Sequence, residues 1–80
     1  MKIPRDLNAQ DLIKKLSVLG YKITRQSGSH IRITTDVNGE YHETIPFQKP
    51  LKVGTLNSIL KNIANHHEIT KEILLRKLNL

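Results

Sequence analysis

The spacing of apolar residues changes twice along this chain, and this change constrains the fold more than any other feature of the sequence. Between residues 9 and 19 apolar side chains recur every three or four positions, which is typical of one face of an α-helix. Between residues 21 and 47 they alternate with polar residues, as in strands that bury one face. Helical spacing returns at Val53. The pattern predicts an α+β fold in the order helix, strands, helix.

Polar residues and glycine mark the ends of the first helix, which is predicted over residues 9–19. Asn8 is expected to cap it, Asp11 lies in the first turn, and Gly20 suits the left-handed residue that follows a helix. The second helix is predicted from an apolar stripe that stands opposite polar residues. The stripe consists of Val53, Leu56, Ile59, Leu60 and Ile63, and the polar side of Asn57, Lys61 and Asn62. A third, short helix is expected after Thr70 as N-cap, with Glu72 in its first turn and Ile69 packed on Leu74.

Three strands are predicted as an antiparallel meander: "YKITRQ" (21–26), "HIRITT" (30–35) and "EYHETIPF" (40–47). The turn residues are "SGS" and Asn38-Gly39, and Pro46 indicates the end of the third strand or an edge position. In the first strand the alternation separates two sets: Tyr21, Ile23 and Arg25 on one face, and Lys22, Thr24 and Gln26 on the other. With so few strands, the sheet must bury one face and leave the other open for a ligand.

Length and composition indicate one small domain over residues 1–80 that lacks disulfides. The chain has 80 residues and no cysteine, and no apolar run approaches the length of a membrane span. We therefore expect a cytoplasmic protein that does not contact a membrane. Thirteen Lys and Arg against seven Asp and Glu give a formal net charge of +6, which favours a polyanionic partner, nucleic acid first, although basic charge also serves solubility.

A basic surface is expected on the open face of the sheet. If Ile31 and Ile33 point at the helices, His30 and Arg32 point outward, and Lys22 shares their face. Three further basic residues lie close along the chain: Arg25, Lys49 and Lys52.

The capped "DLIKKL" helix, "LGYKITRQSGSH", "TIPF" and "LKVGTLNSIL" together resemble the HicA toxins of HicA/HicB toxin-antitoxin systems. The similarity covers about residues 6–78 and combines the motifs "GSH" and "GTL-x-x-IL" at the expected spacing. The resemblance implies a fold like that of double-stranded-RNA-binding domains, with an additional C-terminal helix. It also implies an endoribonuclease that cleaves messenger RNA and is held inactive by a HicB-like antitoxin.

The resemblance places the catalytic residue at His30, with Gly28 and Ser29 before it. Many members carry a histidine or an aromatic residue where this chain has Ile31, and a histidine where it has Gln48. The second difference leaves His30 without one helper.

A single histidine suffices for metal-independent cleavage of RNA, with no cofactor. An unperturbed imidazole titrates at about pH 6.5, so it can remove the proton of the adjacent 2′-hydroxyl, which then attacks the phosphorus. Arg32 and Lys22 are the expected cations at the reacting phosphate, and Arg25, Lys49 and Lys52 the expected contacts to flanking phosphates. Ser29 either binds a phosphate oxygen or only shapes the turn.

Other interpretations of the histidines stay open at this stage. Without the resemblance, His30 reads as an ordinary surface histidine, and His42 is either a second acid on the same face or a solvated strand residue. His66 and His67 lack the partners of a metal site and are expected to be helix-end cations. The alternative function is a non-catalytic module for double-stranded RNA, which the single Lys61 in "VGTLNSILKNI" disfavours; a surface that docks an acidic protein would also fit the charge.

Overall fold

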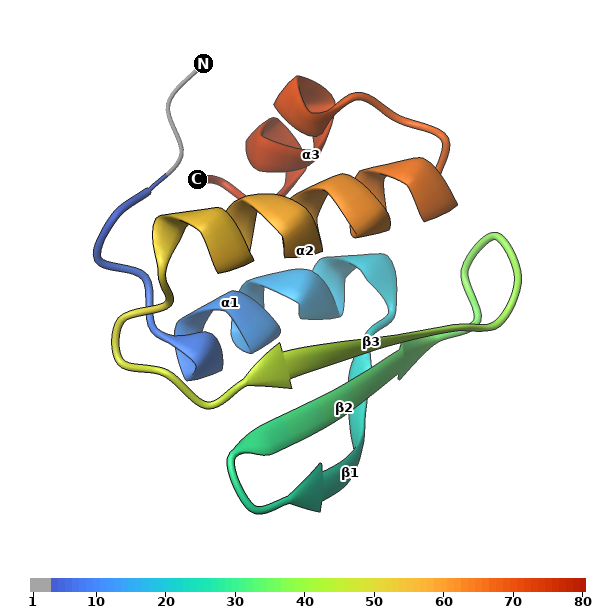
Figure 1. Cartoon of the computed structure of the whole chain (residues 1–80). Helices are drawn as coiled ribbons and strands as arrows, with labels where there is room; N and C mark the ends of the chain where they lie inside the picture. The colour runs from blue at the N-terminus through green and yellow to red at the C-terminus, as the bar shows by residue number, and fades with distance from the viewer. Residues whose placement is uncertain (1–3) are drawn as a thin grey trace.

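The structure, a computed structural model, describes residues 4–80 and has the order helix, three strands, helix, helix (Figure 1). The first helix, α1, spans Ala9–Leu16 and continues as a 3-10 turn, η1, over Ser17–Leu19. The strands are β1 (Lys22–Ser27), β2 (His30–Thr35) and β3 (Tyr41–Pro46), followed by α2 (Val53–His66) and α3 (Lys71–Lys77). The predicted α+β arrangement with an extra C-terminal helix is confirmed. None of the helices in residues 4–80 is long and apolar enough to cross a bilayer.

The molecule has a layer of helices on one face of the sheet only. In Figure 1, α1 and α2 lie side by side above the strands, and α3 packs on the far side of α2. Between these layers lies one hydrophobic cluster that includes Leu12, Leu16, Ile33, Ile45 and Leu60, none of them measurably exposed to solvent. The opposite face of the sheet carries no helix, as the alternation predicted.

The sheet is antiparallel in the order β1-β2-β3, and a register shift in β1 changes one sequence prediction. Ile23 pairs with Ile33, but the next paired residue, Arg25, lies opposite Arg32, so one residue of β1 is extra. Because an extra residue reverses the alternation beyond it, Arg25 shares the face of Arg32, and Gln26 shares that of Ile31. The predicted sides of Arg25 and Gln26 were therefore wrong.

The end of α1 depends on Gly20, and its beginning does not use the predicted side-chain cap. Gly20 has φ +83°, and a Cβ built there would lie 2.8 Å from Cγ2 of Val37. Only glycine fits both the backbone and the space. Asn8 has the extended backbone of an N-cap, but its side chain accepts no hydrogen bond from the helix. In α3 the predicted cap forms, because the amide of Ile73 donates to Thr70 Oγ1 over 3.1 Å.

Candidate nucleic-acid interface

The face of the sheet that points away from the helices, called here the outer face, brings together most of the predicted site residues. Cross-strand pairing and alternation assign its side chains. They are Lys22, Thr24, Arg25 and Ser27 from β1, His30, Arg32 and Thr34 from β2, and His42 and Thr44 from β3. This surface carries three cations and two histidines.

His30 begins β2 directly after the turn formed by Gly28 and Ser29. Gly28 has φ +56°, which lets the chain reverse in a tight turn, and the Ser29 carbonyl accepts a hydrogen bond of 2.7 Å from the Phe47 amide. The side chain of His30 is exposed, and its Nδ1 lies 3.4 Å from Ser29 Oγ, a long contact. Within residues 4–80, Nε2 of His30 has no hydrogen-bond partner. The strand and turn hold the backbone of His30 in place, while Nε2 of its ring is free to contact a ligand.

On the outer face, Arg32 and Arg25 lie nearer to His30 than Lys22 does. Arg32 stands two residues from His30 on the same face, about 7 Å along the strand, and Arg25 lies directly across from Arg32. Lys22 pairs with Thr34, about 13 Å along β2 from His30. The register shift in β1 therefore places Arg25, rather than Lys22, beside the His30 end of the outer face.

Lys49 and Lys52 lie outside the outer face, in the loop between β3 and α2. This loop is fastened to the segment before α1, since the amide of Ala9 donates to the Gln48 carbonyl over 3.1 Å and that of Leu51 to the Leu7 carbonyl over 2.8 Å. The Lys49 ammonium sits 5.1 Å from the ring centroid of Phe47, and Lys52 is the N-cap residue of α2. Both are exposed at the end of the molecule that His30 borders.

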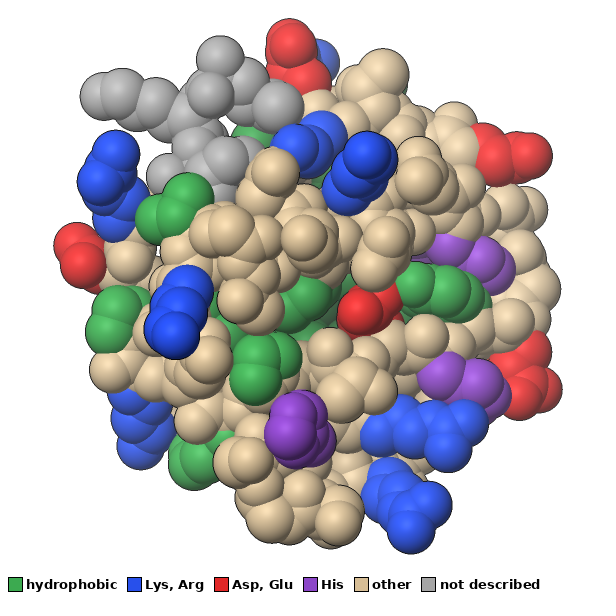
Figure 2. Space-filling model, in the orientation of Figure 1, with side chains coloured by type: hydrophobic (Ala, Val, Ile, Leu, Met, Phe, Trp, Pro, Cys, Tyr) green, Lys and Arg blue, Asp and Glu red, His purple; other side chains and the backbone are tan. Residues whose placement is uncertain are grey.

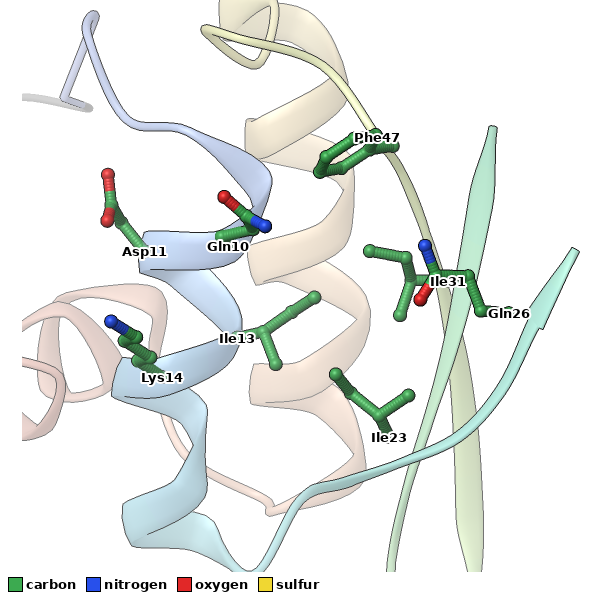
Figure 3. A pocket seen from close by; sticks show the side chains of 8 residues that line it. All are labelled: Gln10, Asp11, Ile13, Lys14, Ile23, Gln26, Ile31 and Phe47. Atoms are coloured by element: carbon green, nitrogen blue, oxygen red, sulfur yellow. The ribbon is translucent and has the colours of Figure 1, made fainter. Parts of the chain in front are cut away.

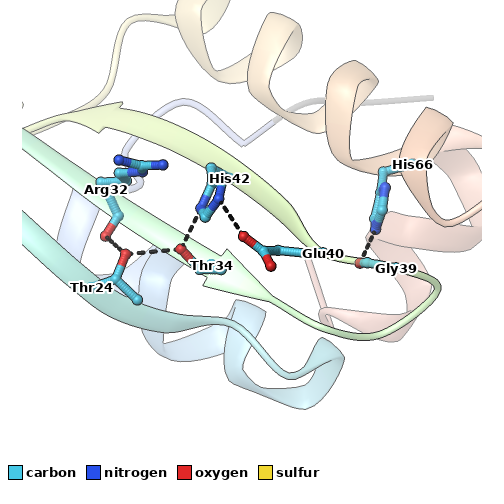
Figure 4. A network of polar contacts seen from close by, with 7 residues as sticks. All are labelled: Thr24, Arg32, Thr34, Gly39, Glu40, His42 and His66. Atoms are coloured by element: carbon cyan, nitrogen blue, oxygen red, sulfur yellow. Dashed lines mark hydrogen bonds and ion pairs between the residues drawn. The ribbon is translucent and has the colours of Figure 1, made fainter.

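A chain of hydrogen bonds crosses all three strands on the outer face and ends at His42 (Figure 4). Oγ1 of Thr24 lies 2.8 Å from Oγ1 of Thr34, which lies 2.7 Å from Nδ1 of His42. Nε2 of His42 lies 2.9 Å from a carboxylate oxygen of Glu40. Sequence reasoning placed His42 on this face but missed Glu40. The available signal was the spacing of two residues before His42, which puts both side chains on one side of an extended chain.

The opposite face of the sheet contains a shallow groove of about 350 Å³ between α1 and β1 (Figure 3). Its floor is apolar, with Ile13, Ile23, Ile31 and Phe47, and polar side chains stand at its rim. None of the predicted site residues lines it. RNA presents a charged backbone, so the cationic outer face suits it better than this apolar groove.

The last two histidines, His66 and His67, are part of the packing between α2 and the sheet. Nε2 of His66 lies 3.0 and 3.1 Å from the carbonyl oxygens of Val37 and Gly39, and its ring stacks on Tyr41 at 4.5 Å. Nε2 of His67 is hydrogen-bonded to the Tyr21 hydroxyl at 3.0 Å. Burial, reinforced by the neighbouring His66, lowers the pKa of His67 below its usual value, so this residue is neutral at neutral pH. The prediction of a cation at His67 was wrong.

Burial also raises the pKa of two tyrosine hydroxyls and one carboxyl group in this part of the molecule. The Tyr41 hydroxyl donates to a Glu43 carboxylate oxygen over 2.6 Å on the inner side of β3. Burial is the largest cause that raises the pKa of Tyr21, Tyr41 and Glu43. Tyr41 and Glu43 lie on the face of β3 that Ile45 shares, and Tyr21 is buried, so these groups do not reach the outer face.

Positive charge alone does not locate the site. In the view of Figure 2, Lys and Arg side chains stand at separate points over helices and strands alike. In the part of the chain that the structure describes, no group of three or more His, Cys, Asp or Glu could hold a metal ion. What distinguishes the outer face is the combination of an exposed histidine with two arginines on adjacent strands.

Comparison with known proteins identifies a family for this chain. A family model described as "HicA toxin of bacterial toxin-antitoxin" matches residues 9–64, which is more than half of the chain. The match runs from the first residue of α1 to the last turn of α2 and includes the whole sheet. No curated protein and no solved structure matches the chain.

Proposed function

Because this chain belongs to the HicA toxin family and is therefore the toxin of a toxin-antitoxin pair, we propose that it acts as a metal-independent endoribonuclease with His30 as its base. The observation that carries the proposal is the position of His30. Its exposed ring stands at a tight turn on an open face, with Nε2 unengaged within residues 4–80 and two arginines two residue positions away along the adjacent strands. An imidazole in such a setting can act as base or acid near neutral pH.

The reaction needs no group beyond the RNA and these side chains. Nε2 of His30 accepts the proton of a 2′-hydroxyl, and the 2′-oxygen bonds to the adjacent phosphorus. The bond from phosphorus to the 5′-oxygen breaks, and this oxygen takes a proton from the His30 imidazolium or from water. The products are a 2′,3′-cyclic phosphate and a 5′-hydroxyl. Arg32 and Arg25 stabilise the charge on the phosphoryl oxygens, and Ser29 Oγ is in place to donate to one of them.

The remaining cations bind the RNA before the cleavage step. Lys22 at the far end of the outer face and Lys49 and Lys52 beside its His30 end attract and hold flanking phosphates of messenger RNA. Gly28 contributes the turn that presents Ser29 and His30.

The test is cleavage of single-stranded RNA by purified protein in EDTA. The wild type should cleave, and His30→Ala should not, while Thr44→Ala, a change on the same face, should leave cleavage intact. Circular dichroism should be the same for all three, since both substituted side chains are exposed. Retained cleavage in His30→Ala, strict dependence on added Mg²⁺, or binding of duplex RNA without cleavage would contradict the proposal.

The antitoxin of this pair is proposed to be an acidic HicB-like protein that covers His30. A surface with cations around one reacting residue lets a partner pair the charges and block the imidazole together. Co-expression of the adjacent gene product should restore growth, and the complex should protect His30 from diethyl pyrocarbonate. Restored growth with His30 still fully reactive would show that inhibition does not mask it.

A further inference from the structure

The strongest feature that the proposed reaction leaves unused is the His42 ring, which is held at both nitrogens. The Glu40 carboxylate can only accept, so Nε2 of His42 donates to it over 2.9 Å. In the neutral ring Nδ1 accepts from the Thr34 hydroxyl, which in turn accepts from Thr24. When both nitrogens carry protons, Nδ1 donates to Thr34, Thr34 to Thr24, and Thr24 to the Arg32 carbonyl 3.4 Å away. Both nitrogens are therefore engaged in either state.

Distance keeps His42 from acting as a second acid at the phosphate that His30 attacks. His42 pairs with Thr34, which is four residues, about 13 Å, along β2 from His30. Side chains on one face of a sheet stand roughly perpendicular to it, so the two rings stay about that far apart. Proton transfer requires contact at hydrogen-bond distance.

What His42 still offers a ligand is the flat surface of its ring. Its side chain is 38% exposed, and because both nitrogens are hydrogen-bonded, the carbon atoms and the ring face are what it still offers to a ligand. A ring fixed in orientation by two hydrogen bonds loses little freedom when a flat partner stacks on it. Unpaired RNA bases stack on aromatic side chains, histidine included, and do so with little regard to sequence.

We propose that the His42 ring is a stacking site for an unpaired base of the RNA, on a nucleotide near the one that His30 cleaves. This inference rests on the proposed function for its ligand. Arg32 lies diagonally between the two histidines and holds the phosphate that joins the two nucleotides. Bases inside a duplex are stacked on each other and cannot reach the ring, so the substrate class is single-stranded RNA. Thr34 and Glu40 are positioning residues for this site.

Binding of a short single-stranded RNA to protein that also carries His30→Ala tests the proposal without interference from cleavage. Against that background, His42→Ala and His42→Leu should raise the Kd by roughly 5- to 100-fold, the usual range for loss of one stacked base. His42→Phe keeps a ring that can stack but loses both hydrogen bonds that orient it, so its Kd should lie between that of the protein with His42 and that of His42→Ala. Ser58→Ala, at an exposed position of α2 away from the sheet, is the control and should not change the Kd.

Two further arms separate stacking from a merely structural role. An oligonucleotide with the stacked base removed should bind wild-type and His42→Ala protein equally. Thr34→Val should weaken binding only while His42 is present, because it acts through the ring. Equal binding of intact RNA by the His30→Ala protein with and without His42→Ala would overturn the stacking site. So would binding by His42→Phe that is no tighter than binding by His42→Ala, when circular dichroism shows both variants folded.

Failure of this site and failure of the proposed function give different results. A protein that binds single-stranded RNA through His42 but cleaves none retains the stacking site and loses the nuclease. A protein that cleaves through His30 and binds equally well with His42→Ala retains the nuclease and loses the stacking site.

Discussion

Two pairs of histidines lie on opposite sides of the sheet and differ in almost everything except residue type. His30 and His42 stand on the outer face, where exposed cations surround them. His66 and His67 close the end of α2, where they contact Tyr41, Tyr21 and the carbonyls of the loop between β2 and β3. All four are the same residue type, and only their neighbours distinguish the pair on the exposed outer face from the pair that packs α2 against the sheet.

The comparison shows that chemical availability depends on which ring atoms remain unengaged. Nε2 of His30 meets only solvent within residues 4–80, whereas Nε2 of His66 and of His67 each lies about 3 Å from an oxygen of another segment. His42 is intermediate, with bonded nitrogens and an exposed ring. Substitutions should therefore change activity at His30 and stability at His67.

The largest effect is expected at His30. His30→Ala should lower the turnover number on RNA by about 100- to 10,000-fold, the range for loss of a general base, and change the free energy of unfolding by less than about 0.5 kcal/mol. Single-turnover kinetics and urea unfolding measure the two quantities. A comparable loss of turnover in folded His67→Ala would abolish the distinction between the two pairs.

The cations on the outer face and in the neighbouring loop should differ in whether they affect turnover or RNA binding. Arg32→Ala should lower turnover about 10-fold more than it weakens RNA binding, since Arg32 lies on the outer face two residues from His30, the proposed base. Lys49→Ala and Lys52→Ala, which lie off the outer face, should mainly raise the Kd and reduce its salt slope by about one each. Binding titrations at several salt concentrations test this, and equal effects of all three on turnover would contradict it.

In the pair that packs α2 against the sheet, His67→Ala should lower the free energy of unfolding by about 1–2 kcal/mol and leave turnover unchanged. The substitution removes the hydrogen-bond partner of the Tyr21 hydroxyl, and Tyr21 is buried, so its hydroxyl is left without a partner. Asn65→Ala, an exposed position in the same helix, is the control and should stay within about 0.5 kcal/mol. An unaffected His67→Ala would mean that Tyr21 finds another partner.

The smallest effect is the pH dependence that His67 contributes. Its pKa in the folded chain lies below the unfolded value of 6.5, so below about pH 6.5 the unfolded chain takes up the proton first. The free energy of unfolding should fall as the pH drops from about 6.5 through the lower folded pKa. His67→Gln should remove this part, so the difference between wild type and variant isolates it from His66 and Glu43. A difference that is constant with pH would contradict the assigned shift.

Local patterns predicted the elements, and long-range contacts determined what they could not. Gly20 and Pro46 mark element ends by their own backbone chemistry, and Thr70 marks the start of α3 by its side-chain hydroxyl, so these ends were predictable. The register shift in β1 depends on pairing between strands, and "YKITRQ" alternates without a break. The sides of Arg25 and Gln26 therefore required the structure.

The same limit applies to the candidate site. The sequence predicted that His30 and Arg32 share an open face, because both alternate against buried isoleucines. It did not predict the partners of His42 and His67. Thr34 meets His42 only through the register of β2 with β3, and Tyr21 reaches His67 from a segment 46 residues away. Loop packing against the start of α1 likewise decides that Lys49 and Lys52 lie off that face.

The most direct test of the central claim is cleavage of an RNA oligonucleotide in EDTA, with and without a single 2′-deoxy nucleotide at the mapped cleavage position. Attack by a 2′-hydroxyl that His30 deprotonates predicts a 2′,3′-cyclic phosphate and a 5′-hydroxyl from the all-ribose strand. It also predicts no cleavage at the substituted bond, and none by His30→Ala. Cleavage of the same bond in the deoxy-substituted strand, or products that carry a 5′-phosphate, would contradict it.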